Sequence, residues 1–535
     1  MDPVEKLGRA IERQATAFAA GVTLTRPGLG RPKQAGFGDY STNVAMLLAP
    51  TLGEPPRAIA ERLGEALGGE LGDSLEKVEV AGPGFLNLTM ADRWYLDALA
   101  ALLEAGDDYG AGVGGEYVNV EFVSANPTGP ITIASARHAA FGDSLCRMLE
   151  RAGHRVEREY YVNDAGSQVR KFGESILARA RGEEPPEDGY QGDYVLELAG
   201  QIEGAADSDP ETLAQRGIEL MLEGVRASLE RFRVRMDAFF FESSLHAEAI
   251  DAALERLEGV YEREGALWLR TSAFGDDKDR VLRRAGGEWT YFGPDIAYHL
   301  NKLERGYDRM IDIWGADHHG YINRLRAAWQ ALGADPHRFE LVIMQLVNLS
   351  EGGRRVQMSK RAGAIASLDD LLDDIGVDAA RWFLVSRSND TTLDVDLELA
   401  RRRSQDNPVY YVQYAHARLA SILRKAGEER VAAALAADLR GSSERFHPSA
   451  RALVKRLLEL PGEVREAALR RAPHRITTYA TETAQELSAF YRDCRVVGAA
   501  EEGADEDVRI AICVAARRVL AQALDLVGVE APEAM

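Results

Sequence analysis

The fold is decided by residues 118–161, which read VNVEFVSANPTGPITIASARHAAFGDSLCRMLERAGHRVEREYY. Apolar residues alternate along 118–122 with the period of a strand, and a proline-glycine turn follows at 126–130. Residues 141–149 carry apolar side chains at helical spacing, and a second strand is expected at 156–161. Strand, tight turn, helix and strand in this order predict a βαβ unit of a parallel sheet.

Outward from this unit, the chain divides into three expected domains. Residues 1–107 combine helical and strand patterns around a glycine-rich loop at 36–43 and predict a small α+β module. Residues 108–405 alternate strands and helices, and an acidic loop at 182–193 leads into an expected helical insertion. Residues 406–535 carry helical patterns almost throughout and predict an all-α bundle. The fold class is therefore multidomain α/β.

Composition limits the possible functions. The 535 residues are 46% hydrophobic and 28% charged, a balance typical of globular proteins. The formal charge of −21 argues against a general binder of polyanions. Any RNA-binding face must then be local, and its affinity should fall steeply with salt.

Targeting and cysteine signals are weak. No run of 18 apolar residues appears, and the first residues lack the layout of a signal peptide. Three scattered cysteines, Cys146, Cys494 and Cys513, argue against a disulfide framework and against a zinc site. We expect a cytoplasmic protein with no membrane contact and no structural metal held by the chain.

Two segments carry phosphate chemistry. The turn at 126–130 leads to a helix N-terminus near Ser135, where backbone N–H groups favour anions, although most such junctions bind nothing. The loop 352–363 places four basic side chains between glycines and can close over a triphosphate, with Lys360 against developing charge. Taken alone, a solvated basic loop explains this second segment better.

Longer strings resemble the class I arginyl-tRNA synthetases, and the resemblance covers essentially the whole chain. The strings that carry it are EFVSANPTGP (121–130), EYYVNDAG (159–166), WGADHHGY (314–321), MSK (358–360), GVDAAR (376–381) and DNPVYYVQYAHAR (406–418), with further likeness at 37–43 and 528–532. The resemblance implies an N-terminal tRNA-contacting domain, a Rossmann-type catalytic domain and a helical anticodon-binding domain.

The resemblance also implies an activity: ATP-dependent attachment of arginine to tRNA(Arg) through an arginyl-adenylate, with Mg2+ carried by the nucleotide. Family members are usually monomers and need bound tRNA before they activate the amino acid. The matching ATP-binding positions are Pro127, Thr128, Gly129, Thr132, Ser135, Met358 and Lys360. Among them the resemblance assigns catalysis to Thr132, Ser135 and Lys360, together with Ser359.

An arginine pocket needs inward-facing acids, because carboxylates match the planar donor fork of a guanidinium. The family pattern maps onto Glu121, Ser124, Asn126, Tyr291, Asp295, Asp317 and His318. By resemblance, Asn126 holds the α-amino or carboxyl end of arginine and Asp295 faces the guanidinium. Tyr291 forms a wall, and Asp317 or His318 completes the site.

The sequence departs from the family at its ATP signature. Thr132 and Ser135 stand where the family usually has two histidines. Gln357 stands where the second signature usually has its first lysine. Losing one preorganised donor typically lowers transition-state stabilisation by about 2.7–4 kcal/mol. In one interpretation the two hydroxyls replace the imidazoles, helped by the helix N-terminus and Arg137.

Two alternatives stay open at this point. The chain could be a paralogue that binds tRNA or a nucleotide without efficient charging. It could also be a small-molecule adenylate-forming ligase, although such an enzyme has no need of a helical C-terminal domain.

Contact with tRNA is expected mainly in that C-terminal domain, because RNA recognition favours aromatic stacking beside basic groups. The candidates are Tyr410, Tyr414, Arg418, Arg451 and Lys455. The loop 37–43 is a further candidate, for the tRNA elbow, by resemblance only.

Overall fold

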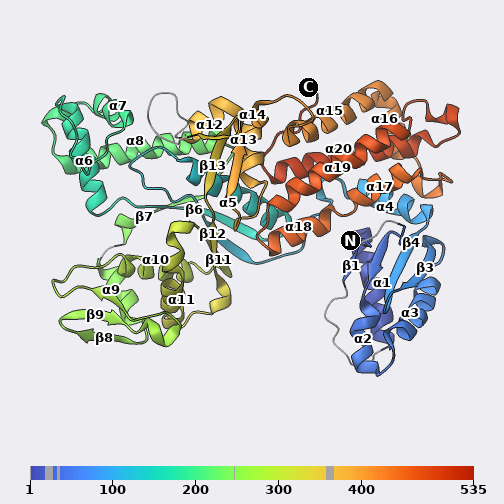
Figure 1. Cartoon of the computed structure of the whole chain (residues 1–535), viewed down its shortest axis with the longest axis horizontal. Helices are drawn as coiled ribbons and strands as arrows, with labels where there is room; N and C mark the ends of the chain where they lie inside the picture. The colour runs from blue at the N-terminus through green and yellow to red at the C-terminus, as the bar shows by residue number, and fades with distance from the viewer. Residues whose placement is uncertain (1, 19–27, 33–35, 246, 357–366) are drawn as a thin grey trace.

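The computed structural model describes residues 2–18, 28–32, 36–245, 247–356 and 367–535. They form an N-terminal domain, a central α/β domain with two insertions, and a C-terminal helical domain (Figure 1). None of the helices in the described part of the chain is both long and apolar enough to cross a membrane.

The N-terminal domain is a four-stranded antiparallel sheet with helices packed on it. The sheet order is β1 (Leu29–Gly30), β2 (Tyr40–Thr42), β4 (Phe85–Met90), β3 (Leu75–Ala81), and the helices are α1 (Pro3–Phe18), α2 (Val44–Leu52) and α3 (Pro56–Leu71). The following helix, α4 (Asp92–Ala105), connects two domains: Trp94 contacts Tyr40 with ring centroids 5.7 Å apart, and the helix also packs on the C-terminal helices.

The central domain is built on a parallel five-stranded sheet. In chain order its strands are β5 (Tyr117–Glu121), β6 (Arg155–Val162), β7 (Ala238–Phe241), β11 (Arg309–Gly315) and β12 (Phe339–Met344). Their spatial order is β12-β11-β5-β6-β7, and α5 (Ile133–Arg151) joins β5 to β6, which confirms the predicted βαβ unit. Because the strand order reverses between β5 and β11, a ligand crevice is expected at the carboxyl ends of these two strands.

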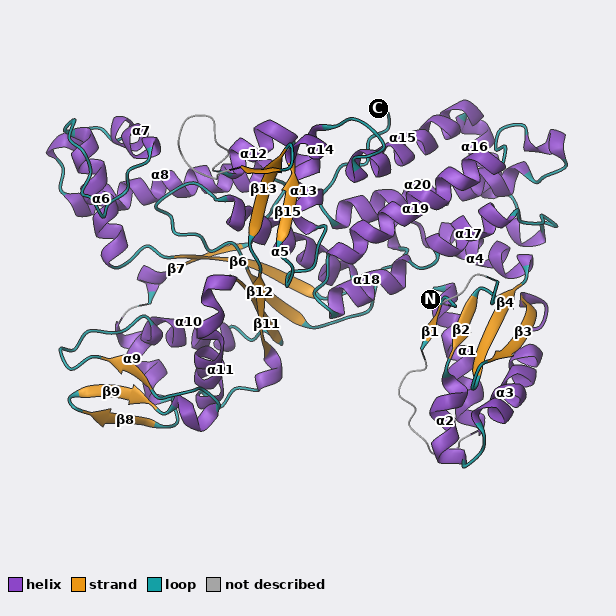
Figure 2. Ribbon diagram, in the orientation of Figure 1, coloured by secondary structure: helices purple, strands orange, loops and turns teal. Residues whose placement is uncertain are grey.

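Two insertions extend from this sheet (Figure 2). The first lies where the sequence predicts a helical insertion and contains α6 (Ser167–Ala180), α7 (Asp193–Gln201) and α8 (Pro210–Arg231). The second contains α9 (Ala247–Glu255), β8 (Val260–Arg263), β9 (Ala266–Leu269), β10 (Arg280–Arg283) and α10 (Phe292–Glu304). The sequence pattern did not predict its small antiparallel sheet, because strands of four residues are too short to show a clear alternation.

The rest of the central domain leads to the second signature. Helix α11 (Ile322–Ala331) joins β11 to β12, and a three-stranded sheet follows with the order β14 (Arg354–Val356), β13 (Val347–Glu351), β15 (Leu393–Asp396). The adjoining helices are α12 (Leu368–Ile375), α13 (Val377–Val385) and α14 (Leu397–Arg401).

The C-terminal domain is all-helical, as predicted. Its helices are α15 (Pro408–Ala426), α16 (Glu428–Ala436), α17 (Pro448–Leu457), α18 (Leu460–Leu469), α19 (His474–Asp493) and α20 (Glu506–Leu526). Buried aliphatic side chains line the inner faces of these helices, including Leu453, Ile476 and Leu520.

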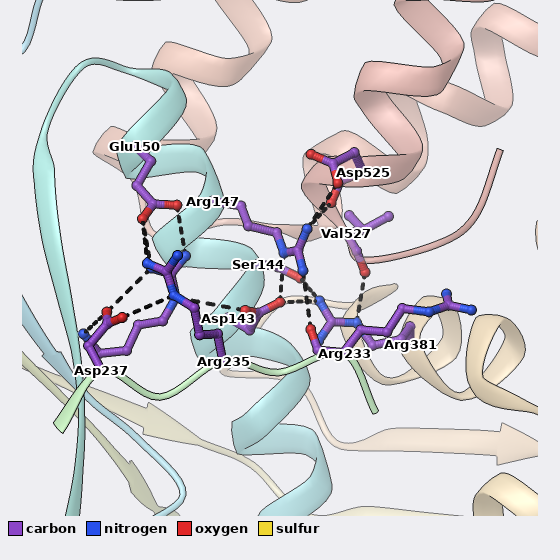
Figure 3. Close-up of polar contacts among 11 residues, drawn as sticks. Asp143, Ser144, Arg147, Glu150, Arg233, Arg235, Asp237, Arg381, Asp525 and Val527 are labelled. Carbon is purple, nitrogen blue, oxygen red and sulfur yellow. Dashed lines mark hydrogen bonds and ion pairs between the residues drawn. The ribbon is translucent and has the colours of Figure 1, made fainter. Parts of the chain in front are cut away.

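A polar junction joins the end of this domain to α5 (Figure 3). Arg381 is fully buried; its Nη2 donates to Asp143 Oδ2 at 2.7 Å and its Nε to the carbonyl oxygen of Val527 at 2.9 Å. Arg147 bridges Asp143 at 2.8 Å and Asp525 at 3.0 Å. The helical domain is therefore docked on the same helix whose N-terminus faces the expected ATP site.

Candidate active site

The N-terminus of α5 has the geometry of an anion site. Thr132 is the N-cap, and its Oγ1 accepts a hydrogen bond from the backbone N–H of Ser135 at 3.2 Å. The two side-chain hydroxyls lie 3.1 Å apart. The free N–H groups of the first helical turn and the helix dipole favour a phosphate here, and both hydroxyls can add donors to it.

The loop that joins β5 to α5 starts with a strained turn. Val123 has φ 70° and Ser124 has φ 38°, in the left-handed region that a β-branched residue rarely adopts. Ser124 Oγ donates to Glu121 Oε1 at 2.9 Å and accepts from the backbone N–H of Tyr161 at 3.1 Å. Such strain costs about 1–3 kcal/mol per residue and concentrates at functional sites.

The described chain resumes beside the N-terminus of α5 after the second signature. Met358, Ser359 and Lys360 lie outside the described residues. Just beyond them, Ser367 forms an antiparallel bridge with Thr132, and the N–H of residue 368 donates to the carbonyl of residue 131 at 2.8 Å. The chain that leaves this signature is thus tied to the N-terminus of α5.

Arg137 does not assist at the phosphates, so that expectation is wrong. Its guanidinium is only 1% exposed and donates to the backbone carbonyls of Gln345 (2.6 Å), Leu346 (3.4 Å), Ser388 (2.9 Å) and Thr391 (3.0 Å). These bonds enclose the cation between α5 and the segments around β13 and β15. Arg137 therefore supports the fold beside the site.

His138, Asp317 and His318 lie near the carboxyl end of β11. A Cβ on Gly315 would stand 2.6 Å from Asp317 Oδ1 and 3.6 Å from His138 Cε1, so the glycine leaves room for the Asp317 carboxylate beside the His138 ring. Burial lowers the pKa of His138 to about 4, which keeps its ring neutral. His318 Nε2 lies 3.6 Å from Asp317 Oδ2, and both side chains are largely exposed.

Two acids and two tyrosines lie together at the same edge of the sheet, around the position expected for the arginine pocket. Asp295, in the first turn of α10, accepts a hydrogen bond from the hydroxyl of Tyr321. Glu242 directly follows β7, and its carboxylate faces the hydroxyl of Tyr161. Burial raises the pKa of both acids, and the negative charge of Asp295 raises that of Glu242 further. Two desolvated acids that lie close together favour a cationic ligand.

Tyr291, expected to form a wall of this pocket, is 72% exposed. His318 lies close enough for its positive charge, when protonated, to lower the pKa of Asp295. The arrangement thus places Asp295, Tyr161, Tyr321 and Glu242 together, with Tyr291 at the surface.

Glu121, expected to face arginine, is held within a buried ionic cluster. Lys302 Nζ donates to Glu121 Oε2 at 2.6 Å and to Asp312 Oδ1 at 2.7 Å. The Tyr298 hydroxyl lies 2.9 Å from Glu121 Oε2, and His299 Nε2 lies 2.9 Å from Asp312 Oδ2. Burial raises the pKa of Glu121, whereas Lys302 and His299 outweigh burial at Asp312 and lower its pKa. In this structure Glu121 supports the floor of the site.

The centre of the β5–α5 loop contacts the helical insertion. Asn126 is exposed, and its Nδ2 donates to Gln168 Oε1 at 3.1 Å. The Tyr194 hydroxyl donates to the carbonyl of Thr128 at 2.8 Å. Pro127 and Thr128 are buried, and Gly129 is partly exposed.

The candidate tRNA residues fall into two groups. Tyr410 and Tyr414 stack with ring centroids 6.3 Å apart, and Arg418 lies 4.8 Å from the Tyr414 ring and 4.6 Å from the Tyr491 ring. This surface ladder, Tyr410-Tyr414-Arg418-Tyr491, has three aromatic rings and one guanidinium between two of them, the groups on which unpaired bases stack.

Arg451 and Lys455 have intramolecular partners in this structure. Arg451 Nη2 lies 2.6 Å from Asp92 Oδ1, and Lys455 Nζ lies 3.5 Å from Asp39 Oδ1, so both tie α17 to the N-terminal part of the chain. Their contact with tRNA stays a prediction.

Sequence reasoning missed several residues of this region: Tyr161, Gln168, Tyr194, Glu242, Lys302 and Tyr321. Glu242 carried a signal, because an acid directly after an apolar strand lies at the carboxyl edge of a parallel sheet. Lys302 carried none, since its partners are distant in sequence. Within the described residues, no group of three or more His, Cys, Asp or Glu side chains is placed to hold a metal ion.

Comparison with known proteins identifies the domains. The model of the arginyl-tRNA synthetase N-terminal domain matches residues 5–90. The model of the class I (R) tRNA synthetase catalytic domain matches residues 204–414, and that of the DALR anticodon binding domain matches residues 412–535.

Whole-chain relatives agree with these matches. The arginine–tRNA ligase of Oceanobacillus iheyensis is 44% identical over 529 residues, 95% of this chain and 94% of its own. That of Frankia alni is 45% identical over 551 residues, 99% and 98% of the two chains. The arginyl-tRNA synthetase structure from Thermus thermophilus aligns with a TM-score of 0.78 at 25% identity, covering 99% of this chain and all of that one. With its parallel sheet, its helical domain and these relatives, the chain belongs to the arginyl-tRNA synthetase family of class I.

Proposed function

We propose that this chain attaches arginine to tRNA at the carboxyl edge of its parallel sheet, using ATP. The observation that carries the proposal is a pair of buried acids, Asp295 and Glu242, at the same sheet edge as the helix N-terminus capped by Thr132. A substrate with a guanidinium at one end and a carboxylate at the other can place its guanidinium at the two acids and its carboxylate toward the helix N-terminus. Family membership makes arginine that substrate.

The reaction has two steps. A carboxylate oxygen of arginine attacks the α-phosphorus of ATP, and pyrophosphate leaves with the electrons of the broken P–O bond. A ribose hydroxyl at the tRNA terminus then attacks the adenylate carbonyl and loses its proton, and AMP leaves. Both steps build negative charge on phosphate oxygens, which preorganised donors stabilise.

The donors available at the phosphates are the α5 N-terminus, the Thr132 and Ser135 hydroxyls, and Lys360. The hydroxyls lie 3.1 Å apart at the first turn, which supports their acting together in place of the two usual imidazoles. Arg137 is not one of these donors, because its guanidinium is enclosed by backbone carbonyls. In the arginine subsite, Asp295 and Glu242 hold the guanidinium while Ser124 and Asn126 lie toward the reacting carboxylate.

No observation favours the two alternatives. The match of residues 412–535 to an anticodon binding domain disfavours a small-molecule ligase, which has no use for such a domain. The retained pair of buried acids, Asp295 and Glu242, disfavours a paralogue that binds tRNA without charging it.

For tRNA we propose the ladder Tyr410-Tyr414-Arg418-Tyr491 as a stacking surface for unpaired bases. Its parallel rings, 7° apart in plane angle, and its interleaved guanidinium support this. We further propose that Mg2+ enters bound to ATP, and that the enzyme is a cytoplasmic monomer, as the family resemblance implies.

The test is charging of tRNA(Arg) with labelled arginine by the purified protein. Lys360→Ala removes the signature lysine, and Lys278→Ala, at an exposed lysine of the second insertion, is the matched control. We expect charging by the wild type and the control and its loss in Lys360→Ala. Absence of charging by a folded wild type that binds tRNA would refute the proposal and favour the paralogue.

A further inference from the structure

The helical insertion reaches the centre of the loop between β5 and α5. Within the described residues, the hydrogen bonds of 126–130 both lead to this insertion: Asn126 Nδ2 to Gln168 Oε1 at 3.1 Å, and Tyr194 to the Thr128 carbonyl at 2.8 Å. The two contacts come from α6 and α7. The centre of the loop is thus shaped by elements outside the parallel sheet.

The ends of the same loop have other anchors. At its start, the Tyr160 hydroxyl donates to the Ala125 carbonyl at 2.7 Å. At its end, the N–H of Leu368 donates to the Ile131 carbonyl at 2.8 Å. Since both ends are anchored independently, weakening the central contact should change the conformation of 127–129 without releasing the whole loop.

Tyr194 is well placed for this role. Its side chain is partly buried, and the next residue, Val195, is fully buried and fixes α7 against the insertion core. A Cβ on Gly129 would lie 3.4 Å from the Tyr194 hydroxyl, an ordinary van der Waals contact, so the loop backbone passes close to the ring. Thr128 is 5% exposed, which makes its carbonyl dependent on a protein donor.

We propose that Tyr194 is a positioning residue for ATP: its hydroxyl holds the Thr128 carbonyl and thereby orients the backbone of 127–129 toward the nucleotide. The inference rests on the proposed ATP site at this loop. It assigns to the helical insertion a part in nucleotide binding that is separate from the arginine pocket, which lies on α10 and the ends of β6 and β7.

The test is Tyr194→Phe, which keeps the ring and removes only the hydroxyl. Losing a neutral hydrogen bond of this kind should raise the KM for ATP about two- to tenfold. We expect that rise in tRNA-dependent ATP–pyrophosphate exchange, with the KM for arginine and the melting temperature unchanged. Tyr190→Phe is the matched control, since it makes the same change on the same insertion, where the ring packs on Phe172 with centroids 5.3 Å apart.

The outcomes separate the inference from the proposed function. A KM for ATP equal to that of the wild type, or parallel rises in both KM values, would overturn the role of Tyr194. A lower melting temperature with unchanged KM values would show a purely structural contact and also overturn it. Wild-type exchange activity in the same assay keeps the proposed function intact in either case, whereas its absence from the wild type counts against the proposed function.

Discussion

Lys302→Met tests the ionic cluster under the site. Lys302 is fully buried, and its Nζ lies 2.6 Å from Glu121 Oε2, 2.7 Å from Asp312 Oδ1 and 4.5 Å from the centre of the Tyr298 ring. Methionine has a similar length, so the main change is the loss of the charge that two buried carboxylates share. Removing one partner of a buried ion pair typically costs about 3–5 kcal/mol, because the remaining charge is left uncompensated.

We expect a loss of this size in the free energy of unfolding at neutral pH. The assay is urea unfolding followed by tryptophan fluorescence, with the transition of the central domain analysed separately because a chain of this size need not unfold in two states. Adding Glu121→Gln to Lys302→Met removes one orphaned charge. The double variant should therefore be more stable than the single variant, with a coupling energy within about 0.5–3 kcal/mol.

The pH dependence gives a second check with a defined sign. Lys302 and His299 lower the folded-state pKa of Asp312, so this acid stabilises the fold above its unfolded pKa of about 3.9 and loses that contribution as pH falls. Because the variant lacks much of that contribution, its deficit in the free energy of unfolding should shrink as the pH falls below about 4. A deficit below about 1 kcal/mol at neutral pH, or one that widens in acid, would refute this account of the cluster.

Three further predictions concern the substrates. Asp295→Asn should raise the KM for arginine about 10- to 100-fold, the range for a hydrogen bond to a charged group, with little change in the KM for ATP. Because burial raises the pKa of Asp295, the wild-type KM for arginine should rise as the pH falls, and steady-state charging measures both effects. Thr132→Ala should destabilise α5 by about 0.5–2 kcal/mol through loss of its N-cap and should lower kcat, whereas Thr132→Ser should retain both in melting and charging assays. Arg418→Ala should weaken tRNA binding by about 1–3 kcal/mol and make it less salt-dependent; unchanged affinity across a salt titration would count against the ladder.

Much of the architecture follows from local pattern. The alternation at 118–122 and the helical spacing at 141–149 predicted β5 and α5, and the helical C-terminal domain followed from its spacing alone. The short strands β8, β9 and β10 escaped prediction, because four residues carry too little periodicity and their pairing partners are set by the hairpin around them.

For the proposed site, the resemblance pointed to Asp295, and in the structure Glu242 and Tyr321 lie beside this residue. The sequence could not show that Arg137 turns away from the phosphates, because its four acceptor carbonyls lie more than 200 residues further along the chain. An arginine next to a phosphate-binding signature has the same sequence context whether it contacts the phosphates or supports the fold.

The sequence by itself therefore determined the family by resemblance, and it determined the parallel sheet and the helix α5 by pattern, since strand alternation and helix spacing act over a few residues. Only the tertiary structure decided which charges are available to substrates. Glu121 and Lys302 are 181 residues apart in sequence and meet at 2.6 Å, so an acid expected to bind arginine is engaged within the fold. Burial makes such ion pairs necessary, because an unpaired charge that is removed from water strongly destabilises the fold. The partner can come from any part of the chain that packs beside it.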